Sequence, residues 1–258
     1  MMAQQHSMVH RALGTKIVLT VYGDEYFPLL SQAMKMIDGY EDRLTVNRPV
    51  SEVMAVNQAA GRTPKLVSPT TYELIKLAVH YSRENFGFNA LIGPLVKLWK
   101  IGFTGANVPS DRAIKDRLRL IDPYQVLLDD DNRTVYLEQP GMELDLGGIA
   151  KGYIADRVRD FWLAQGVPAG IINLGGNLVF VGQSPRRADG QWIIGVQDPQ
   201  LKRGHDLETV RQPACSAVTS GIYERFLVKD GRRYHHLLDP RTGYPLETDL
   251  SSVTVGNG

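Results

Sequence analysis

The sequence contains very little cysteine and almost no net charge. Its single cysteine, Cys215, excludes an intramolecular disulfide, and a net charge of +1 over 258 residues gives no field that would attract nucleic acid or a membrane surface. No block of like charges forms an interaction tail. Because Cys215 lies in a short apolar run, we interpret it as a small buried residue of a strand, with a reactive thiol as the alternative.

Long apolar runs are also missing. No stretch reaches the roughly 20 apolar residues that a membrane-spanning helix needs. Residues 1–11 are polar and include two histidines, unlike the apolar core of a signal peptide. The chain as written is therefore expected in the cytoplasm, and a leader removed before Met1 would make an extracytoplasmic location the alternative.

The common glycine-rich nucleotide fingerprints are absent as well. Neither G-x-G-x-x-G nor G-x-x-x-x-G-K-[ST] describes the glycine runs of this chain, so a common dinucleotide fold is not predicted. Three histidines at ligand spacing are missing, which argues against a zinc site. The composition, with 43% hydrophobic and 22% charged residues, predicts a packed core.

The periodicity of the apolar residues predicts helices and strands in partly separate regions. Helical spacing covers 25–44 (with Asp24 as the N-cap), 68–85, 93–99, 110–120 and 149–165. Strand patterns cover 15–22, 125–128, 134–138, 169–174, 177–182, 191–197, 213–219, 225–229 and 251–255, while 45–61 has an irregular pattern. Because helices and strands do not alternate strictly, we expect an α+β fold in one compact domain.

The run D-L-G-G-I-A-K-G, from Asp145 to Gly152, is the most informative stretch. Its glycines allow a ligand to approach the backbone closely. The helix that follows directs amide donors toward an anion, and Lys151 adds a positive charge. The run predicts a phosphate site; a glycine turn capped by Asp145, with Lys151 in solvent, is the alternative.

Two further glycine runs carry weaker signals. In N-L-G-G-N, from Asn173 to Asn177, a double glycine follows an apolar strand, which is typical of close ligand approach or of a tight hairpin turn. In Gly87-Phe88-Asn89 an aromatic ring stands beside a glycine after a helix. This ring lines a pocket or, as its residue type favours, belongs to the core.

The polar run from Tyr234 to Tyr244 contains an H-x-x-D pair, His236 and Asp239. Such a pair can lie on one side of a turn, where the aspartate orients the imidazole and raises its basicity, as in general-base sites. His235 is the histidine that we expect to be structural or solvent-facing. A capped turn with surface histidines is the alternative.

Taken in this order, the motifs resemble the ApbE family of FAD:protein FMN transferases. The resemblance covers nearly the whole chain and includes S-G-x-Y-E-R-F at Ser220 to Phe226, and its most distinctive part is H-x-x-D-P-R-T-G at His236 to Gly243. It implies an α+β domain over residues 1–258 with FAD in a cleft and Mg²⁺ at the diphosphate. The implied reaction moves FMN from FAD onto a threonine hydroxyl of an acceptor protein and releases AMP.

The resemblance also assigns roles to individual residues. Those that match flavin-nucleotide contacts are Leu13, Asn47, Gly87, Phe88, Asn89, Asp145, Lys151, His236 and Leu237. The main-chain carbonyl of Gly148 matches a metal ligand. For the chemistry, Lys151 would neutralise phosphate oxygens, and His236, oriented by Asp239, would activate the hydroxyl.

Three features depart from the family pattern. Asn47 replaces a tyrosine that packs on the flavin, a stack worth about 1–3 kcal/mol per ring, so hydrolysis of FAD to FMN and AMP becomes an alternative activity. Asn89 replaces an aspartate. The sequence stops at Gly258, before an A-D-x-x-x-T-A segment whose aspartate and threonine bind the metal. We therefore expect a truncated C-terminal end with weaker metal binding, and a non-catalytic FAD-binding protein is the third alternative.

Overall fold

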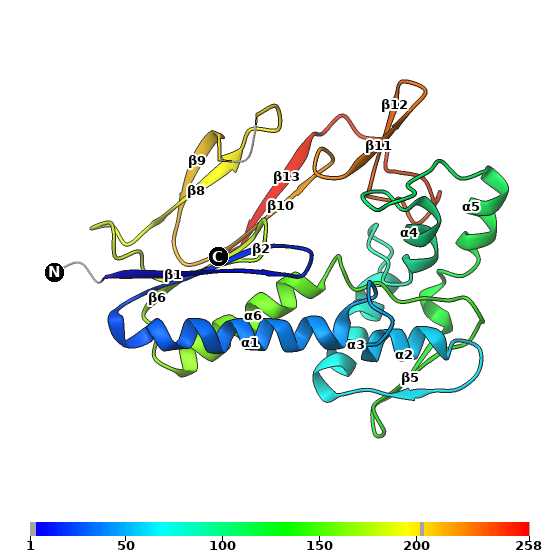
Figure 1. Cartoon of the computed structure of the whole chain (residues 1–258), viewed down its shortest axis with the longest axis horizontal. Coiled ribbons are helices and arrows are strands. Elements are labelled where there is room, and N and C mark those ends of the chain that lie inside the picture. The colour runs from blue at the N-terminus through cyan, green and yellow to red at the C-terminus, as the bar shows by residue number, and fades with distance from the viewer. Residues whose placement is uncertain (1–3, 202–203, 258) are drawn as a thin grey trace. The chain divides into compact units, whose positions relative to one another are not determined.

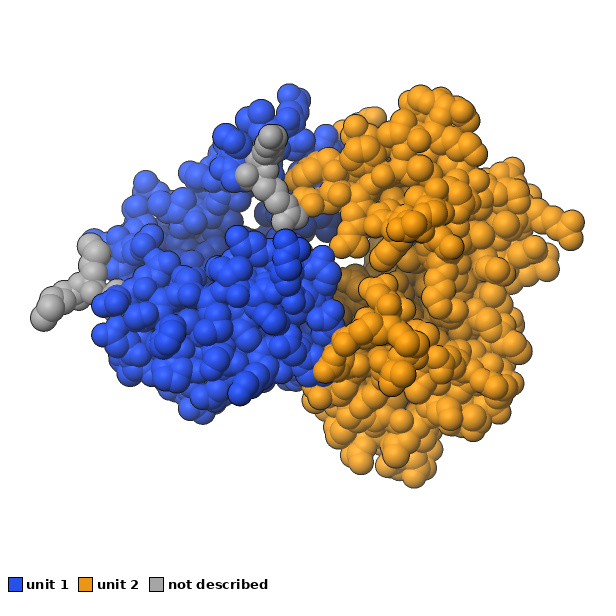
Figure 2. All heavy atoms as spheres, viewed as in Figure 1, with its two compact units in different colours: residues 1–41, 151–221, 250–258 blue, residues 42–150, 222–249 orange. Residues whose placement is uncertain are grey.

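The computed structural model describes residues 4–201 and 204–257. Helices and strands both contribute, which confirms the α+β class (Figure 1). The chain divides into two compact units: unit 1 comprises residues 1–41, 151–221 and 250–258, and unit 2 comprises residues 42–150 and 222–249 (Figure 2). The single domain expected from the sequence stays a prediction. Within the described ranges, no helix has both the length and the apolar character that crossing a membrane requires.

Unit 1 is built on a six-stranded sheet in which every neighbouring pair is antiparallel. Its strands, in spatial order, are β1 (Gln5–Ala12), β2 (Thr15–Tyr22), β6 (Ala169–Asn173), β7 (Asn177–Gly182), β10 (Ser216–Gly221) and β13 (Ser252–Asn257). Helices α1 (Phe27–Leu44) and α6 (Ala150–Ala164) run beside this sheet (Figure 1). The buried ring of Trp162 in α6 packs against Gly170 in β6, where a Cβ would lie 2.8 Å from it.

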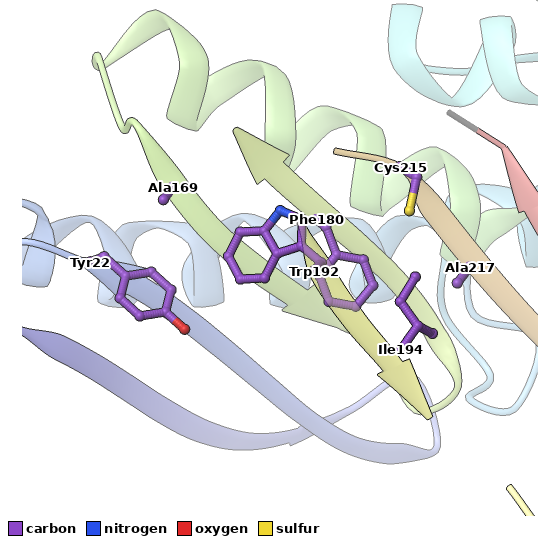
Figure 3. Close-up of a cluster of buried hydrophobic side chains, with 7 residues drawn as sticks. All are labelled: Tyr22, Ala169, Phe180, Trp192, Ile194, Cys215 and Ala217. Atoms are coloured by element: carbon purple, nitrogen blue, oxygen red, sulfur yellow. The ribbon is translucent and has the colours of Figure 1, made fainter. Parts of the chain in front are cut away.

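A cluster of buried side chains in unit 1 connects the sheet to a two-stranded ribbon. The ribbon consists of β8 (Trp192–Gln197) and β9 (Asp206–Gln212), and Figure 3 shows the cluster: Tyr22, Ala169, Phe180, Trp192, Ile194, Cys215 and Ala217. The ring centroids of Phe180 and Trp192 lie 5.4 Å apart. Cys215 is buried there, and this burial raises the pKa of its thiol, so the interpretation as a core residue is confirmed.

Unit 2 contains most of the helices and two small sheets. The sheets are β3 (Lys65–Leu66), β5 (Thr134–Leu137) and β4 (Val126–Asp129), and the hairpin of β11 (Phe226–Lys229) and β12 (Arg232–His235). The helices are α2 (Glu52–Gln58), α3 (Pro69–Arg83), α4 (Gly93–Trp99) and α5 (Asp111–Leu118). Its core includes Trp99, whose indole N–H donates to the Gly243 carbonyl over 2.8 Å, which ties α4 to the turn after β12.

One buried side chain fixes the segment that leads to the glycine turn. The Asn57 amide donates to the Leu144 carbonyl (2.9 Å) and accepts from the Leu144 N–H (2.8 Å). Residues 142–146 alternate, with Met142, Leu144 and Leu146 buried. Glu143 and Asp145 consequently face the other side of this extended run.

The predicted helices 68–85, 93–99, 110–120 and 149–165 all form, as does the hairpin of β4 and β5. Asp24 is not the N-cap of α1: a 3₁₀ turn, η1 (Asp24–Tyr26), precedes the helix, and the Asp24 carboxylate pairs with His6 Nε2 at 2.6 Å. Helix α2 forms within the supposedly irregular 45–61, capped by Ser51. Strands β1, β3, β9 and β12 were not expected. The predictions for the polar N-terminus (1–11) and for the C-terminal end fall in part on residues 1–3 and 258, which lie outside the described residues.

Candidate flavin-nucleotide site

The turn from Asp145 to Gly148 forms the entrance to helix α6. The Asp145 carboxylate accepts from the Gly147 N–H over 2.8 Å, and the N–H groups of Ile149 and Ala150 both donate to the Leu146 carbonyl. Burial raises the pKa of the Asp145 carboxyl above 3.8, against the opposing effects of the Gly147 N–H and the Lys97 ammonium. Asp145 therefore caps the glycine turn, and its charged form is poorly solvated there.

The loop after α3 lies directly against this turn. The Asp145 N–H donates to the Ala90 carbonyl over 2.8 Å. The half-buried ring of Phe88 is so close to Gly148 that a Cβ on this glycine would lie 3.1 Å from it. Two segments that the sequence assigned to one site, 87–89 and 145–148, are thus neighbours within unit 2, and Phe88 belongs to their contact rather than to the deep core.

Asn89 holds the loop in place through both ends of its amide. Its Nδ2 donates to the Ile121 carbonyl and its Oδ1 accepts from the Leu91 N–H, each over 2.8 Å. Because one partner can only accept and the other only donate, the orientation of the amide is determined. An ionised aspartate could not donate to Ile121, so asparagine at this position fits the structure of this loop. A contact of Asn89 with FAD stays a prediction.

The expected pairing of His236 with Asp239 is wrong. The Asp239 carboxylate is bound by its own turn: Arg241 donates its main-chain N–H and Nε to Oδ1 (2.9 and 3.0 Å) and Nη2 to Oδ2 (2.9 Å). This arginine lowers the pKa of Asp239. The D-P-R-T-G turn folds the guanidinium back onto the carboxylate, where a two-pronged contact is strong. For Asp239 the capped-turn alternative holds.

His236 takes its partner from the preceding strand instead. Its Nδ1 lies 3.2 Å from the Arg225 carbonyl, which also accepts the His236 N–H. Because a carbonyl oxygen only accepts, Nδ1 must carry the proton, and Nε2 is the unprotonated nitrogen of the neutral ring. Burial lowers the pKa of His236 below 6.5, with the hydrogen bond to Arg225 opposing. A neutral, half-buried imidazole with Nε2 as acceptor has the form that a general base needs near pH 7.

His235 is structural, as expected. It is buried, its Nε2 donates to the Leu246 carbonyl over 2.8 Å, and its Nδ1 accepts from the Leu237 N–H over 3.3 Å. This pairing holds Leu237 in the strand-like segment after β12. Asn47 is exposed in the bend after α1, anchored by its main-chain N–H to Thr45 Oγ1 at 3.2 Å. The FAD contacts of Leu237 and Asn47 stay predictions.

Two predicted contacts belong to unit 1. Leu13 lies in the turn between β1 and β2 with φ 54°, a left-handed conformation that is uncommon for a bulky residue. Lys151 is partly buried in the first turn of α6, beside the amides that begin this helix. The position of Lys151 is the one that the phosphate-site hypothesis requires, and its contact with a phosphate stays a prediction.

The N-L-G-G-N run is a tight turn between β6 and β7. Asn173 Oδ1 accepts from the Gly175 N–H over 2.9 Å, and the Leu174 N–H donates to the Asn177 carbonyl over 2.8 Å. At Gly175 φ is 72°, and a Cβ would lie 2.1 Å from the Thr15 hydroxyl oxygen. This glycine is therefore required by the packing of Thr15, as the hairpin alternative predicted.

A Mg²⁺ ion would find part of its coordination sphere here. No group of three or more His, Cys, Asp or Glu side chains in residues 4–201 and 204–257 could hold a metal. The ion usually takes one or two protein ligands together with water and substrate phosphates. Gly148 is exposed, and its carbonyl and the carboxylate of Asp145 in the same turn are oxygen donors of this kind, while the role of Gly148 as a metal ligand stays a prediction. The turn fits such a partial site.

Some contacts of the site could not be found from motifs. Ser82 of α3 accepts the Ala90 N–H (2.8 Å) and donates to the Ala78 carbonyl (2.6 Å), so it anchors the loop from below. The Arg225 carbonyl orients His236, and the Ile121 carbonyl holds Asn89. Main-chain partners carry no side-chain signature, although S-G-x-Y-E-R-F does include Arg225.

Comparison with known proteins identifies the family of this chain. A profile described as "ApbE family" matches residues 13–257. The chain is 48% identical over 244 residues to the FAD:protein FMN transferase of Klebsiella pneumoniae (strain 342), covering 94% of this chain and 74% of that protein. It is 35% identical to the protein of the same name from Treponema pallidum (strain Nichols), covering 98% and 74%.

Solved structures show the same relationship. A crystal structure of the ApbE protein of Thermotoga maritima matches with a TM-score of 0.88 and 33% identity, covering 98% of this chain and 82% of that one. The apo flavinyl transferase ApbE of Pseudomonas stutzeri matches with a TM-score of 0.83 and 26% identity, covering 99% and 80%. The fold is thus that of a class of flavin transferases. This chain belongs to the ApbE family.

Proposed function

We propose that this chain transfers FMN from FAD to an acceptor protein, the activity for which its relatives are named. The observation that carries the proposal is the contact between the loop 87–90 and the turn 145–148, made by the Asp145–Ala90 hydrogen bond and by Phe88 against Gly148. Both segments are those expected to bind the flavin nucleotide. Their proximity supports one binding surface in unit 2.

His236 is the proposed general base. Its Nε2 would take the proton of a threonine hydroxyl on the acceptor, because Nδ1 is committed to the Arg225 carbonyl. The freed oxygen attacks the FMN phosphorus, a new P–O bond forms, and the bond to the bridging oxygen of the diphosphate breaks. That oxygen leaves with AMP and keeps the electron pair. Asp239 contributes by holding the turn that follows His236.

Charge neutralisation is the second requirement of this reaction. Lys151 and the N-terminal amides of α6 would stabilise negative charge on phosphate oxygens. The Gly148 carbonyl would hold Mg²⁺, which when bound neutralises diphosphate oxygens. Burial disfavours the charged form of Asp145, and a cation bound beside it would stabilise that charged form.

The test is mass spectrometry of a threonine-bearing acceptor peptide after incubation with the chain, FAD and Mg²⁺. We expect a covalent FMN adduct and an equal amount of AMP. A matched peptide with alanine in place of the threonine is the control, and chelation of the metal should stop the reaction. FAD binding without any adduct on a proper acceptor would contradict the proposal.

Hydrolysis of FAD to FMN and AMP is the second candidate, favoured by exposed Asn47 in place of a stacking tyrosine. It predicts AMP release without an acceptor. Asn47→Tyr should then tighten FAD binding and reduce this hydrolysis relative to transfer. A chain that binds FAD and never releases AMP would instead be a flavin-binding protein without catalysis.

A further inference from the structure

A cleft of about 470 Å³ lies in unit 2, outside the contacts assigned to the flavin nucleotide. Its lining comes from α4, α5, the loop after α4 and the turn at Gly141. The apolar part consists of Pro94, Leu98 and Leu120, and the cationic part of Lys97, Lys100 and Arg117. The volume falls in the range of small-molecule sites, roughly 300–1,000 Å³.

The cleft carries two positive charges that no acid compensates. Lys97 Nζ lies 2.6 Å from Glu143 Oε2, so this pair is neutral as a unit. The side chains of Lys100 and Arg117 make no ion pair or hydrogen bond with any residue that the structure describes. A cleft lined by apolar side chains and by these two exposed cations fits an amphipathic dianion by charge.

The backbone of Lys100 gives a second, independent indication. Lys100 is the C-cap of α4 with φ 54° and ψ 26°, the left-handed conformation at which glycine is favoured. A cation at a helix C-terminus also interacts favourably with the helix dipole, which is the simplest explanation of Lys100 and Arg117. The dipole, however, requires neither a lysine at a glycine-favouring position nor apolar side chains in the same cleft lining.

The cleft adjoins the turn already described. Glu143 lines it, and Glu143 and Asp145 face the same side of the extended run 142–146. Lys97 is close enough to Asp145 to lower the pKa of that carboxyl. A ligand in the cleft would therefore lie next to the candidate flavin site while contacting other residues.

We propose that this cleft binds a phosphate monoester that carries a flat apolar group, the chemistry of a nucleoside monophosphate. The Arg117 guanidinium offers two parallel N–H donors to phosphate oxygens, and the Lys100 ammonium adds a point charge. A monoester carries a charge of about −1.5 to −2 at pH 7, which the two free cations balance. The organic group rests on Pro94, Leu98 and Leu120.

AMP is the probe for the test, measured by isothermal titration calorimetry on the whole chain without FAD or metal. The variants are Lys100→Gly and Arg117→Gln, and Lys115→Gln, an exposed cation of α5 outside the cleft, is the matched control. Loss of one charge-assisted contact should weaken AMP binding roughly tenfold or more, and the control should bind as the wild type does. Adenosine and inorganic phosphate should each bind more weakly than AMP.

The Lys100→Gly variant should fold as the wild type does, because glycine is favoured at this backbone conformation. Its melting temperature should match that of the wild type, so a loss of AMP binding would not reflect unfolding. AMP affinity that is unchanged in both variants would overturn the inference. So would an equal loss of FAD affinity, which would assign the cleft to the flavin site, or inorganic phosphate binding as tightly as AMP. Failure of flavin transfer with cleft-dependent AMP binding intact would count only against the proposed function.

Discussion

At the scale of single residues, the neighbouring histidines His235 and His236 have different hydrogen-bond partners. Both ring nitrogens of His235 bind main-chain groups, so this histidine is structural, as expected, and the role of His236 as a base stays a prediction. The partner of His236 was missed, since a main-chain carbonyl leaves no mark in a sequence. Asp239 looked like a catalytic partner because H-x-x-D spacing does not show that Arg241 will take the carboxylate.

The protonation of His236 makes a prediction for the pH dependence of transfer. Burial lowers the pKa of this imidazole, so its base form persists below pH 6.5. We expect kcat/KM to fall as the pH drops through this lowered pKa, with the acidic limb below 6.5. His236→Gln should remove that limb and reduce AMP release far more than FAD binding. A limb retained in His236→Gln would assign the titration to another group.

Asn89→Asp tests the amide that braces the loop. The ionised carboxylate would face the Ile121 carbonyl without a proton to donate, so a hydrogen bond becomes a repulsive contact. We expect a loss of about 1–3 kcal/mol in the free energy of unfolding at pH 7, measured with urea. The deficit should shrink at acidic pH, where the protonated acid can donate. Asn47→Asp, at an exposed position, should stay within about 0.5 kcal/mol of the wild type, and equal effects in the two variants would contradict the bracing role.

At the scale of elements, most helices were predictable, whereas helix α2 and strands β1, β3, β9 and β12 were not. Apart from α2, the helices of unit 2 follow the predicted apolar spacing, and Ser110 caps the start of α5. Strand β1 has polar residues on both faces, because His6 and His10 turn inward to meet Asp24 and Asp38 at 2.6 and 2.7 Å. A strand with histidine–aspartate hydrogen bonds on one face lacks the alternation of apolar residues on which sequence prediction depends.

The turn between β6 and β7 should depend on Thr15 of the neighbouring strand. Gly175→Ala adds a Cβ that would lie 2.1 Å from the Thr15 hydroxyl oxygen, at φ 72°. Gly166→Ala is the matched control, because φ is 75° there and nothing lies within 4 Å. The control should cost about 1–2 kcal/mol for the left-handed backbone alone, and Gly175→Ala about 1–3 kcal/mol more for the overlap. Chemical denaturation measures both.

A double-mutant cycle separates these two causes. Thr15→Ala should recover part of the loss in Gly175→Ala, because it removes the atoms nearest to the new Cβ, and should recover nothing in Gly166→Ala. Equal costs of the two glycine substitutions would show that backbone conformation alone explains Gly175.

At the scale of the whole molecule, the order of several motifs carried more information than any one of them. D-L-G-G-I-A-K-G, N-L-G-G-N and H-x-x-D-P-R-T-G each had a plain structural alternative, and for Gly175 and Asp239 that alternative is what the structure shows. The family was nevertheless correctly identified, because shared descent preserves turns and caps together with ligand contacts. Motif recognition therefore identified the family, whereas the roles of individual residues stay predictions or, for the pairing of Asp239 with His236, were wrong.

Asp145 links the stability of the whole chain to its proposed activity. A carboxyl whose pKa is raised above 3.8 in the folded state binds more protons there than in the unfolded chain, so stability is lost as pH rises through the folded pKa. Asp145→Asn keeps the acceptor for the Gly147 N–H and removes the charge, so it should raise the melting temperature at pH 7 and leave it unchanged near pH 3. Addition of FAD should raise the melting temperature of the Asp145→Asn variant less than that of the wild type. A ligand at 100 times its dissociation constant stabilises a folded protein by about 2.7 kcal/mol. The melting temperatures of wild type and variant, measured at pH 7 and near pH 3 with and without FAD, test these expectations. A variant less stable than the wild type at pH 7 would contradict this prediction. It would show that the charged carboxylate stabilises the glycine turn by more than its burial costs.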